Sequence, residues 1–151
     1  MPTLREMTGS DVPAVCGLLR ELGYELTEGE VARRLREVDR HPDHLALVLE
    51  DDEEGGGDGS PIAFLHMFDR PAIEKPREAV VQALIVTESR RGKGFGRAMM
   101  EWVETWAHDR GLGSIALSTQ VHRGDAQVFY HRLGYRVANE SRLLRKHLTP
   151  E

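Results

Sequence analysis

This chain of 151 residues has little of several features that would point to whole classes of protein. It has one cysteine, Cys16, so no disulfide can form within the chain, which fits a reducing compartment. No apolar run is long enough to cross a membrane, and residues 1–5 lack the apolar stretch of a secretory signal. The sequence therefore predicts a cytoplasmic protein that makes no membrane contact.

The chain also lacks an excess of positive charge and any paired metal-ligand spacing. It has 20 basic against 25 acidic residues, a formal net charge of −5, which argues against a nucleic-acid-binding surface. The 7 histidines show no spacing of paired metal ligands, so we predict no metal. A hydrophobic content of 40% and a charged content of 30% are ordinary for a globular protein, and the length suits one domain with a full core.

Residues 81–97 are the most informative part of the chain. The apolar run 81–86 is followed by a glycine-rich basic segment, residues 90–97, and then by an amphipathic helix pattern. A strand, a glycine loop and a helix in this order can hold phosphate. Glycines let the backbone approach a ligand, and the helix start offers unpaired N–H groups and the positive end of the helix dipole. The cations of this segment are Arg90, Arg91, Lys93 and Arg97.

Two common phosphate loops do not fit the glycine spacing of this segment. A Walker loop needs Ser or Thr after its Gly-Lys pair, and here another glycine follows that pair. A dinucleotide fingerprint needs a third glycine or an alanine, and the corresponding positions hold Arg97 or Met99. The spacing that does fit is Arg91-x-x-Gly94-x-Gly96.

This loop resembles the coenzyme A pyrophosphate loop of the GCN5-related N-acetyltransferases, in which a strand, R-G-x-G-x-G and a helix follow one another. A second block, residues 123–135, resembles the late motif of that family, roughly N-x-x-A-x-x-F-Y-x-x-x-G-F/Y. Two positions depart from the pattern: Arg123 stands where Asn is usual, and Gln82 stands where many members carry a glutamate. The resemblance implies an N-acetyltransferase that uses acetyl-CoA as cosubstrate.

The predicted elements extend the resemblance over nearly the whole chain. Their order, β-α-α-β-β-β-α-β-α-β, is that of the acetyltransferase fold, an α/β fold with a mixed central sheet and helices on both faces. All 151 residues then form one domain. An acidic, glycine-rich stretch, residues 51–59, is predicted to be the tip of a hairpin. The predicted strands cover residues 3–7, 44–50, 62–69, 81–86, 114–119 and 135–146, and the last helix covers residues 126–133.

The resemblance also assigns the contacts to the cofactor. Backbone groups near Leu84, Ile85 and Val86 would pair with the pantetheine arm like an added strand. The loop would form the cradle for the pyrophosphate, although a solvated basic surface is the alternative interpretation of its cations. The cradle residues are Arg91, Gly92, Lys93, Gly94, Phe95, Gly96 and Arg97.

Acyl transfer from a thioester also needs a group that protonates the departing thiolate. Tyr130 matches the general acid of the family, and the resemblance places it against the cofactor as well. A phenol with a pKa of about 10 is protonated at neutral pH and can donate. The alternative is that Tyr130 is only a core aromatic on its helix, like its neighbour Phe129.

The attacking amine must lose a proton, and the usual glutamate is absent. Gln82 is a neutral amide that can position a water molecule or the substrate but cannot act as a base. An imidazole suits this task near pH 7, so His66 and His122 are candidates, with a structural or surface role as the alternative for each. A water chain to Glu78 or Glu88, or an acceptor amine with a low pKa, would make a dedicated base unnecessary.

We expect the chain to transfer an acetyl group from acetyl-CoA to a primary amine of a small molecule, directly in a ternary complex. The late block looks most like members that act on aminoglycosides, aminoalkylphosphonates or other small amines. Two alternatives stay open: acetylation of a protein amino group, and an acyl-CoA-binding module with weak catalysis, which Gln82 makes plausible. Cys16 is expected to be a buried core residue rather than a nucleophile. The oligomeric state is open, a homodimer included.

Overall fold

The computed structural model describes residues 2–51, 58–119, 121 and 123–149. The chain divides into two compact units, Met1–Ser118 and Thr119–Glu151, and each is described by itself. Within the described residues, the first unit contains the sheet and three α-helices, and the second contains one α-helix. The single domain expected from the sequence stays a prediction.

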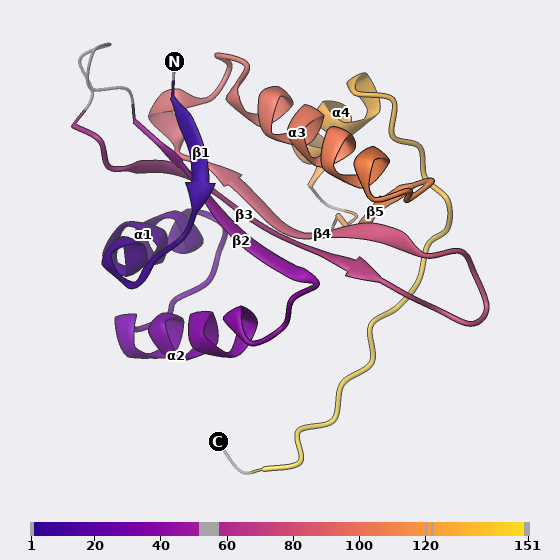
Figure 1. Cartoon of the computed structure of the whole chain (residues 1–151), viewed down its shortest axis with the longest axis horizontal. Helices are drawn as coiled ribbons and strands as arrows, with labels where there is room; N and C mark the ends of the chain where they lie inside the picture. The colour runs from indigo at the N-terminus through magenta and orange to yellow at the C-terminus, as the bar shows by residue number, and fades with distance from the viewer. Residues whose placement is uncertain (1, 52–57, 120, 122, 150–151) are drawn as a thin grey trace. The chain divides into compact units, whose positions relative to one another are not determined.

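A five-stranded sheet forms the centre of the first unit, with its strands in chain order (Figure 1). The pairs β1–β2, β2–β3 and β3–β4 are antiparallel, whereas β5 runs parallel to β4 after a helical crossover. This is the mixed sheet that the sequence predicts, and the α/β fold class is confirmed. The strands are β1 (Thr3–Glu6), β2 (His44–Glu50), β3 (Pro61–Arg70), β4 (Glu78–Val86) and β5 (Ile115–Leu117).

Helices cover both faces of this sheet, as Figure 1 shows. The helices α1 (Val12–Glu21) and α2 (Glu28–Asp39) share one buried cluster with side chains of the sheet. α3 (Phe95–Asp109) packs on the other face through its apolar stripe, where Ala107 shares a buried cluster with Ala79 of β4. Burial of apolar surface on both faces is the main force that holds the layers together. The sheet side chains in the first cluster are Val48, Phe64 and Ile85.

Local sequence signals mark the starts of the first two helices. Thr27 Oγ1 accepts a hydrogen bond from the Glu30 N–H at 3.1 Å, and the Glu30 carboxylate accepts one from the Thr27 N–H at 3.4 Å. This capping box satisfies two N–H groups that have no partner inside α2. α1 has Pro13 in its first turn, where a missing N–H costs nothing, and the chain turns away after it at Gly23, with φ of +105°.

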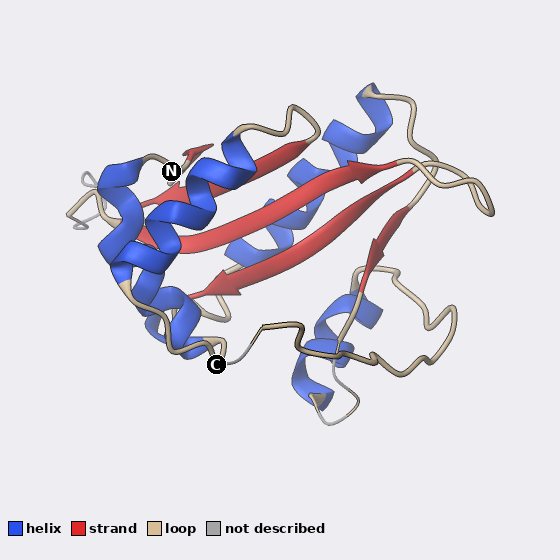
Figure 2. Ribbon diagram, turned by 90° about the horizontal axis from the view of Figure 1, so that it is seen from below, coloured by secondary structure: helices blue, strands red, loops and turns tan. Residues whose placement is uncertain are grey.

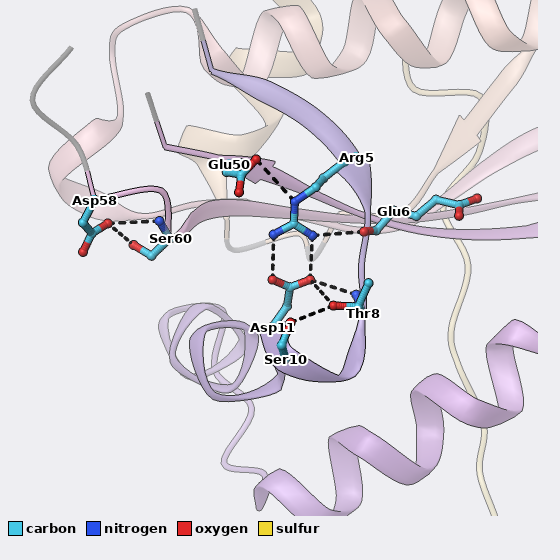
Figure 3. A network of polar contacts seen from close by, with 8 residues as sticks. All are labelled: Arg5, Glu6, Thr8, Ser10, Asp11, Glu50, Asp58 and Ser60. Carbon is cyan, nitrogen blue, oxygen red and sulfur yellow. Dashed lines mark hydrogen bonds and ion pairs between the residues drawn. The ribbon is translucent and has the colours of Figure 1, made fainter. Parts of the chain in front are cut away.

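A buried carboxylate joins β1 to the start of α1 (Figure 3). Asp11 is 4% exposed, and its two oxygens accept hydrogen bonds from Arg5 Nη1 and Nη2, both at 2.8 Å. The Thr8 N–H donates to the same carboxylate at 2.8 Å. The bond from Arg5 is the largest effect that holds the pKa of Asp11 below its ordinary value, against burial, which raises it. The pair therefore fixes the turn by which the chain passes from the sheet to α1.

Replacing Asp11 by alanine should destabilise the protein by about 2–3 kcal/mol, because the Arg5 guanidinium and the Thr8 N–H lose their partner. Glu50→Gln is the matched control. Glu50 lies 3.5 Å from the same guanidinium, but its side chain is 40% exposed, so the change should cost less than about 1 kcal/mol. Urea unfolding measures both values, and equal losses in the two variants would contradict this account.

The strand predicted over residues 135–146 is wrong. The last regular element of the described residues is α4 (Gly124–Arg132), and the part of the second unit after it, up to residue 149, contains no strand. A strand persists only when a neighbouring strand satisfies its backbone groups, and an apolar pattern alone does not provide that neighbour. The large apolar side chains of this segment are instead exposed: Val137, Leu143, Leu144 and Leu148.

Two smaller predictions concern the strand after α3 and the hairpin of β2 and β3. The strand expected over residues 114–119 is shorter, since only Ile115–Leu117 pair with β4. The hairpin of β2 and β3 is confirmed, with Glu50 opposite Pro61 at its end. The residues predicted to form the tip of this hairpin lie largely outside the described residues, which omit 52–57.

Candidate functional site

β4 provides the framework of the candidate site, and its pairing changes halfway along. Residues 79–81 pair with β5, and beyond them no strand of the described residues continues along that edge. On the other edge, the register with β3 shifts between His66 and Met67, so Gln82 is the extra residue of a bulge. The edge at residues 82–86, which includes the three predicted pantetheine contacts, is therefore open to an extended ligand.

The glycine loop follows directly on this open edge. Gly92 and Gly94 have φ values of +76° and +88°, a left-handed conformation that residues other than glycine rarely adopt. Gly94 is the N-cap of α3 and has no side chain to bind the first N–H groups of the helix. Phe95 and Gly96 are the first two residues of α3, so the loop ends at a helix N-terminus, as the sequence predicts.

Arg91 ties this loop to the rest of the first unit. Its Nε donates to the Val86 carbonyl oxygen at 2.8 Å, and its Nη2 lies 3.4 Å from the Glu21 carboxylate of α1. The same carboxylate accepts hydrogen bonds from the Thr87 hydroxyl and the Glu88 N–H, both at 2.8 Å. One acidic side chain of α1 thus holds the start of the loop in place, and Arg91 has a structural role besides its predicted role in the cradle.

The other three cations of the loop have different surroundings. Arg90 pairs with Asp51 at the end of β2, at 2.8 Å. Arg97 pairs with Glu101 on the exposed side of α3, at 3.1 Å, and Lys93 makes no ion pair within the described part of the chain. Lys93 and Arg97 are both exposed at the helix start, so they are the cations available to an anion there.

His66 lies opposite Ala83, next to the bulge at Gln82. Its Nε2 is 3.0 Å from Nδ1 of His44, and both rings are half-buried. Burial, and then the neighbouring His44, lower the pKa of His66 to about 4, so the ring is neutral at pH 7. The Gln82 side chain is exposed at the bulge, where an amide can orient a bound molecule.

The remaining candidates for the proton acceptor are less well placed. Glu78 pairs with Arg70 and also accepts a hydrogen bond from the Ser114 hydroxyl at 3.0 Å. The Glu88 side chain is exposed. His122 lies outside the described residues. His66 is therefore the predicted base that the first unit brings next to the bulge of β4.

Stability should depend on pH through His66. Its pKa is about 4 in the folded protein against 6.5 in the unfolded chain, so the unfolded chain binds the extra proton between these values. Stability should fall as the pH drops from 6.5 to 4. Each pKa unit corresponds to about 1.4 kcal/mol, so the free energy of unfolding would fall by roughly 3 kcal/mol for a fully buried ring. The fall is smaller here, because the ring is partly exposed and solvent screens its charge.

His66→Gln should lose less stability over this range, since the amide does not titrate. Urea unfolding of the parent and the variant at pH 7 and pH 4.5 measures the difference. Glutamine roughly matches the size of the imidazole, so the comparison at pH 7 gives the cost of the substitution itself. The same fall in stability for both proteins would show that His66 is not the group that titrates.

In the second unit, Tyr130 belongs to an aromatic cluster on α4. Its ring meets Phe129 edge-on at 4.9 Å and Tyr135 edge-on at 5.8 Å between centroids. Burial raises the pKa of Tyr130 to about 12, against a smaller lowering by Arg123. The hydroxyl is thus protonated at neutral pH, as a proton donor must be, and the ring packing also fits the alternative of a structural aromatic.

Three further features of the described residues concern a nucleophilic thiol, a metal site and a membrane-spanning helix. Cys16 is buried, and burial raises the pKa of its thiol, so it is a poor source of the thiolate that a nucleophile needs. Within the described residues, no group of three or more His, Cys, Asp or Glu side chains could hold a metal ion. Among the helices described, none is both long and apolar enough to span a membrane.

His44 is the residue that sequence reasoning missed. It is 22 positions from His66 in the chain, and only the β2–β3 register, with Ala46 opposite His66 and His44 opposite Phe68, puts the two rings on one face. Both strands were predicted, so the missing information was the register between them. A hairpin register assigned from the apolar pattern would have identified the pair.

Comparison with known proteins gives a family match and several relatives. The model of the acetyltransferase (GNAT) family matches residues 13–135. The chain is 35% identical over 78 residues to the uncharacterized N-acetyltransferase YhdJ of Bacillus subtilis, which covers 51% of the chain and 54% of that relative. The match thus spans about half the length of the Bacillus protein. The aminoalkylphosphonate N-acetyltransferase of Salmonella typhimurium is 30% identical over 132 residues, with 87% of this chain and 80% of that relative covered.

A solved structure supports the same fold. The aminoglycoside antibiotic 6'-N-acetyltransferase AAC(6')-Ih from Acinetobacter baumannii superimposes with a TM-score of 0.81. The match covers 99% of this chain and 100% of that chain, at 16% sequence identity. At this identity the likeness shows the fold alone.

Proposed function

The chain belongs to the GNAT acetyltransferase family, and on this premise we propose that it transfers the acetyl group of acetyl-CoA to a primary amine of a small molecule. The observation that carries the proposal is the junction of β4 and α3. An edge left open beyond residue 81 leads into glycines at φ of +76° and +88° and then into a helix N-terminus. Such a junction suits an extended pantetheine arm followed by its pyrophosphate.

The pyrophosphate of the cofactor binds at the glycine loop in this proposal. The first N–H groups of α3 donate to its oxygens, and the exposed Lys93 and Arg97 add positive charge. Gly94 and Gly96 keep side chains away from the place where the backbone meets the phosphates. Arg91 holds the loop to the end of β4 through the Val86 carbonyl.

The pantetheine arm binds along the open edge, where Leu84, Ile85 and Val86 have backbone groups to pair with it. A backbone N–H of this edge polarises the carbonyl oxygen of the thioester, which develops negative charge as the amine attacks. Direct transfer in a ternary complex is favoured over a covalent intermediate, because the sole cysteine is buried with a raised pKa. Tyr130 then protonates the departing thiolate.

A small amine is the acceptor that the comparisons favour. The Salmonella relative is named for acetylation of aminoalkylphosphonates, and the match spans most of its length. The late block of the sequence, residues 123–135, resembles members that act on small amines. The exposed Gln82 at the bulge favours one competing function, an acyl-CoA-binding module with weak catalysis, because it replaces an acidic side chain by a neutral amide.

Release of free thiol from acetyl-CoA, measured across a panel of small primary amines, tests the proposed activity. Amine-dependent release is expected with at least one member of the panel. Binding of acetyl-CoA without any amine-dependent release would favour the binding module. Faster release with lysine-containing peptides than with every small amine would favour acetylation of proteins.

Replacing Gly96 by valine should weaken acetyl-CoA binding at least tenfold, or by about 1.4 kcal/mol, while the protein stays folded. Gly96 is the second residue of α3, so valine fits the helical backbone but occupies the place where the pyrophosphate approaches. Gly29→Val is the matched control, because Gly29 is the second residue of α2, and should leave the affinity unchanged. Calorimetry measures both. Parental affinity in a folded Gly96→Val protein would contradict the cradle.

Tyr130→Phe should lower kcat by about 10² to 10⁴, the range typical of general acid catalysis, with little change in acetyl-CoA affinity or stability. The substitution keeps the ring that packs on Phe129 and removes only the hydroxyl. Tyr135→Phe is the control, since the family pattern accepts either residue there. Steady-state kinetics distinguishes the two roles of Tyr130, because a structural aromatic would retain normal kcat as phenylalanine.

A further inference from the structure

Two imidazoles meet on one face of the sheet, beside the bulge of β4. His44 lies at the start of β2 and His66 in the middle of β3, and 3.0 Å separates Nδ1 of the first from Nε2 of the second. At this distance one ring donates an N–H and the other accepts it. His66 makes no other hydrogen bond within the described residues, so its Nδ1 is available to a bound molecule.

The two rings are less buried than the side chains that α1 and α2 cover on this face. Val48 and Phe64 on the same face are buried under these helices, whereas His44, His66 and Phe68 are only half-buried. Figure 2 shows the strands running on past the helices that cross this face. A substrate that reaches the bulge of β4 from this face would lie next to His66, since His66 lies opposite Ala83.

The His44 ring is held in a defined orientation. It stacks on Phe68, with 4.6 Å between the centroids and 8° between the planes. Asp43 raises the pKa of His44, but burial, and then His41, outweigh it and lower that pKa, so the ring stays neutral near pH 7. A neutral ring with a fixed Nδ1 is a suitable acceptor for an N–H of its neighbour.

We propose that His44 is a positioning residue that fixes His66 as the Nε2–H tautomer and thereby makes its Nδ1 the acceptor of the amine proton. This inference rests on the proposed function. The proton moves from the attacking nitrogen to Nδ1 of His66 as the C–N bond forms. The Nε2–H of His66 keeps its hydrogen bond to Nδ1 of His44 during this transfer. The proton leaves Nδ1 for water when the acetylated product departs.

His44 acts on the tautomer of His66 and not on its basicity, because burial and then His44 lower the pKa of His66 to about 4. An imidazole in a partly buried place is a weak acceptor by itself, because burial disfavours its charged form. The hydrogen-bond acceptor on its far nitrogen sets the tautomer, and acceptance of the proton at Nδ1 depends on that tautomer. Gln82, at the bulge next to Ala83, then needs only to orient the amine.

Kinetics of three variants tests this role, with acetyl-CoA and the best amine of the panel. His44→Phe keeps a flat ring against Phe68 but removes the acceptor, and should lower kcat at least tenfold with KM for acetyl-CoA within twofold. His44→Gln, whose amide oxygen can accept the N–H, should recover at least threefold of that loss. His41→Ala is the matched control, since this ring lies 5.5 Å from His44 and donates nothing to His66, and its kcat should stay within twofold.

The inference is overturned if His44→Phe keeps kcat within twofold of the parent, or if His44→Gln is as slow as His44→Phe. Nitrogen-15 NMR of the imidazoles at pH 7 gives a readout that does not need turnover. It should show His66 as the Nε2–H tautomer in the parent and as a mixture in His44→Phe, and an Nδ1–H tautomer in the parent would overturn the inference. No amine-dependent thiol release by the parent would contradict the proposed function, and the NMR result would still decide the role of His44.

Discussion

The candidate site depends on one constraint, the end of the pairing between β4 and β5 after residue 81. Up to that point the two strands satisfy each other's backbone groups, and after it one edge of β4 is left without a strand neighbour in the described chain. The glycine loop follows the same strand, so the open edge leads along the chain into the helix N-terminus. A ligand with an extended arm and a phosphate group at its end matches both parts at once.

The bulge at Gln82 changes which side chains of β4 face each side of the sheet. Val81 lies opposite Met67 and Leu84 opposite Leu65, so two residues three positions apart face the same side of the sheet. The extra residue lets β4 keep apolar side chains against α3 on both sides of the bulge. It also brings the polar side chain of Gln82 out to the surface at the point where the open edge begins. The bulge therefore both preserves the apolar packing of β4 and exposes the Gln82 side chain.

Much of the fold could be predicted from the sequence, because strong local patterns decide it. The capping box at Thr27 and the glycines of the loop mark helix starts through local backbone chemistry, and a helix begins at each of them. The bulge could not be predicted, since residues 79–86 are apolar on either side of Gln82 and either register looks the same. The strand expected over residues 135–146 failed for a related reason, because a pattern cannot supply the neighbour that a strand needs.

In the candidate site, too, a short segment of the sequence predicts some features, whereas others depend on contacts between distant segments. The cofactor loop follows from spacing within one short segment, so the sequence is enough to find it. The His44–His66 contact joins two strands through their register, and the Glu21 carboxylate reaches the loop from 66 positions away. Contacts of this kind depend on how elements pack, and no short segment of the sequence carries them.

The central claim is that acetyl-CoA lies along the open edge of β4 and ends at the start of α3. Backbone amide chemical shifts of nitrogen-15-labelled protein, followed during titration with acetyl-CoA, test it most directly. The account predicts that the largest changes fall on the amides of residues 82–86 and 93–97. Saturable binding whose largest changes fall instead on β1 and β2, with these two segments unmoved, would contradict it.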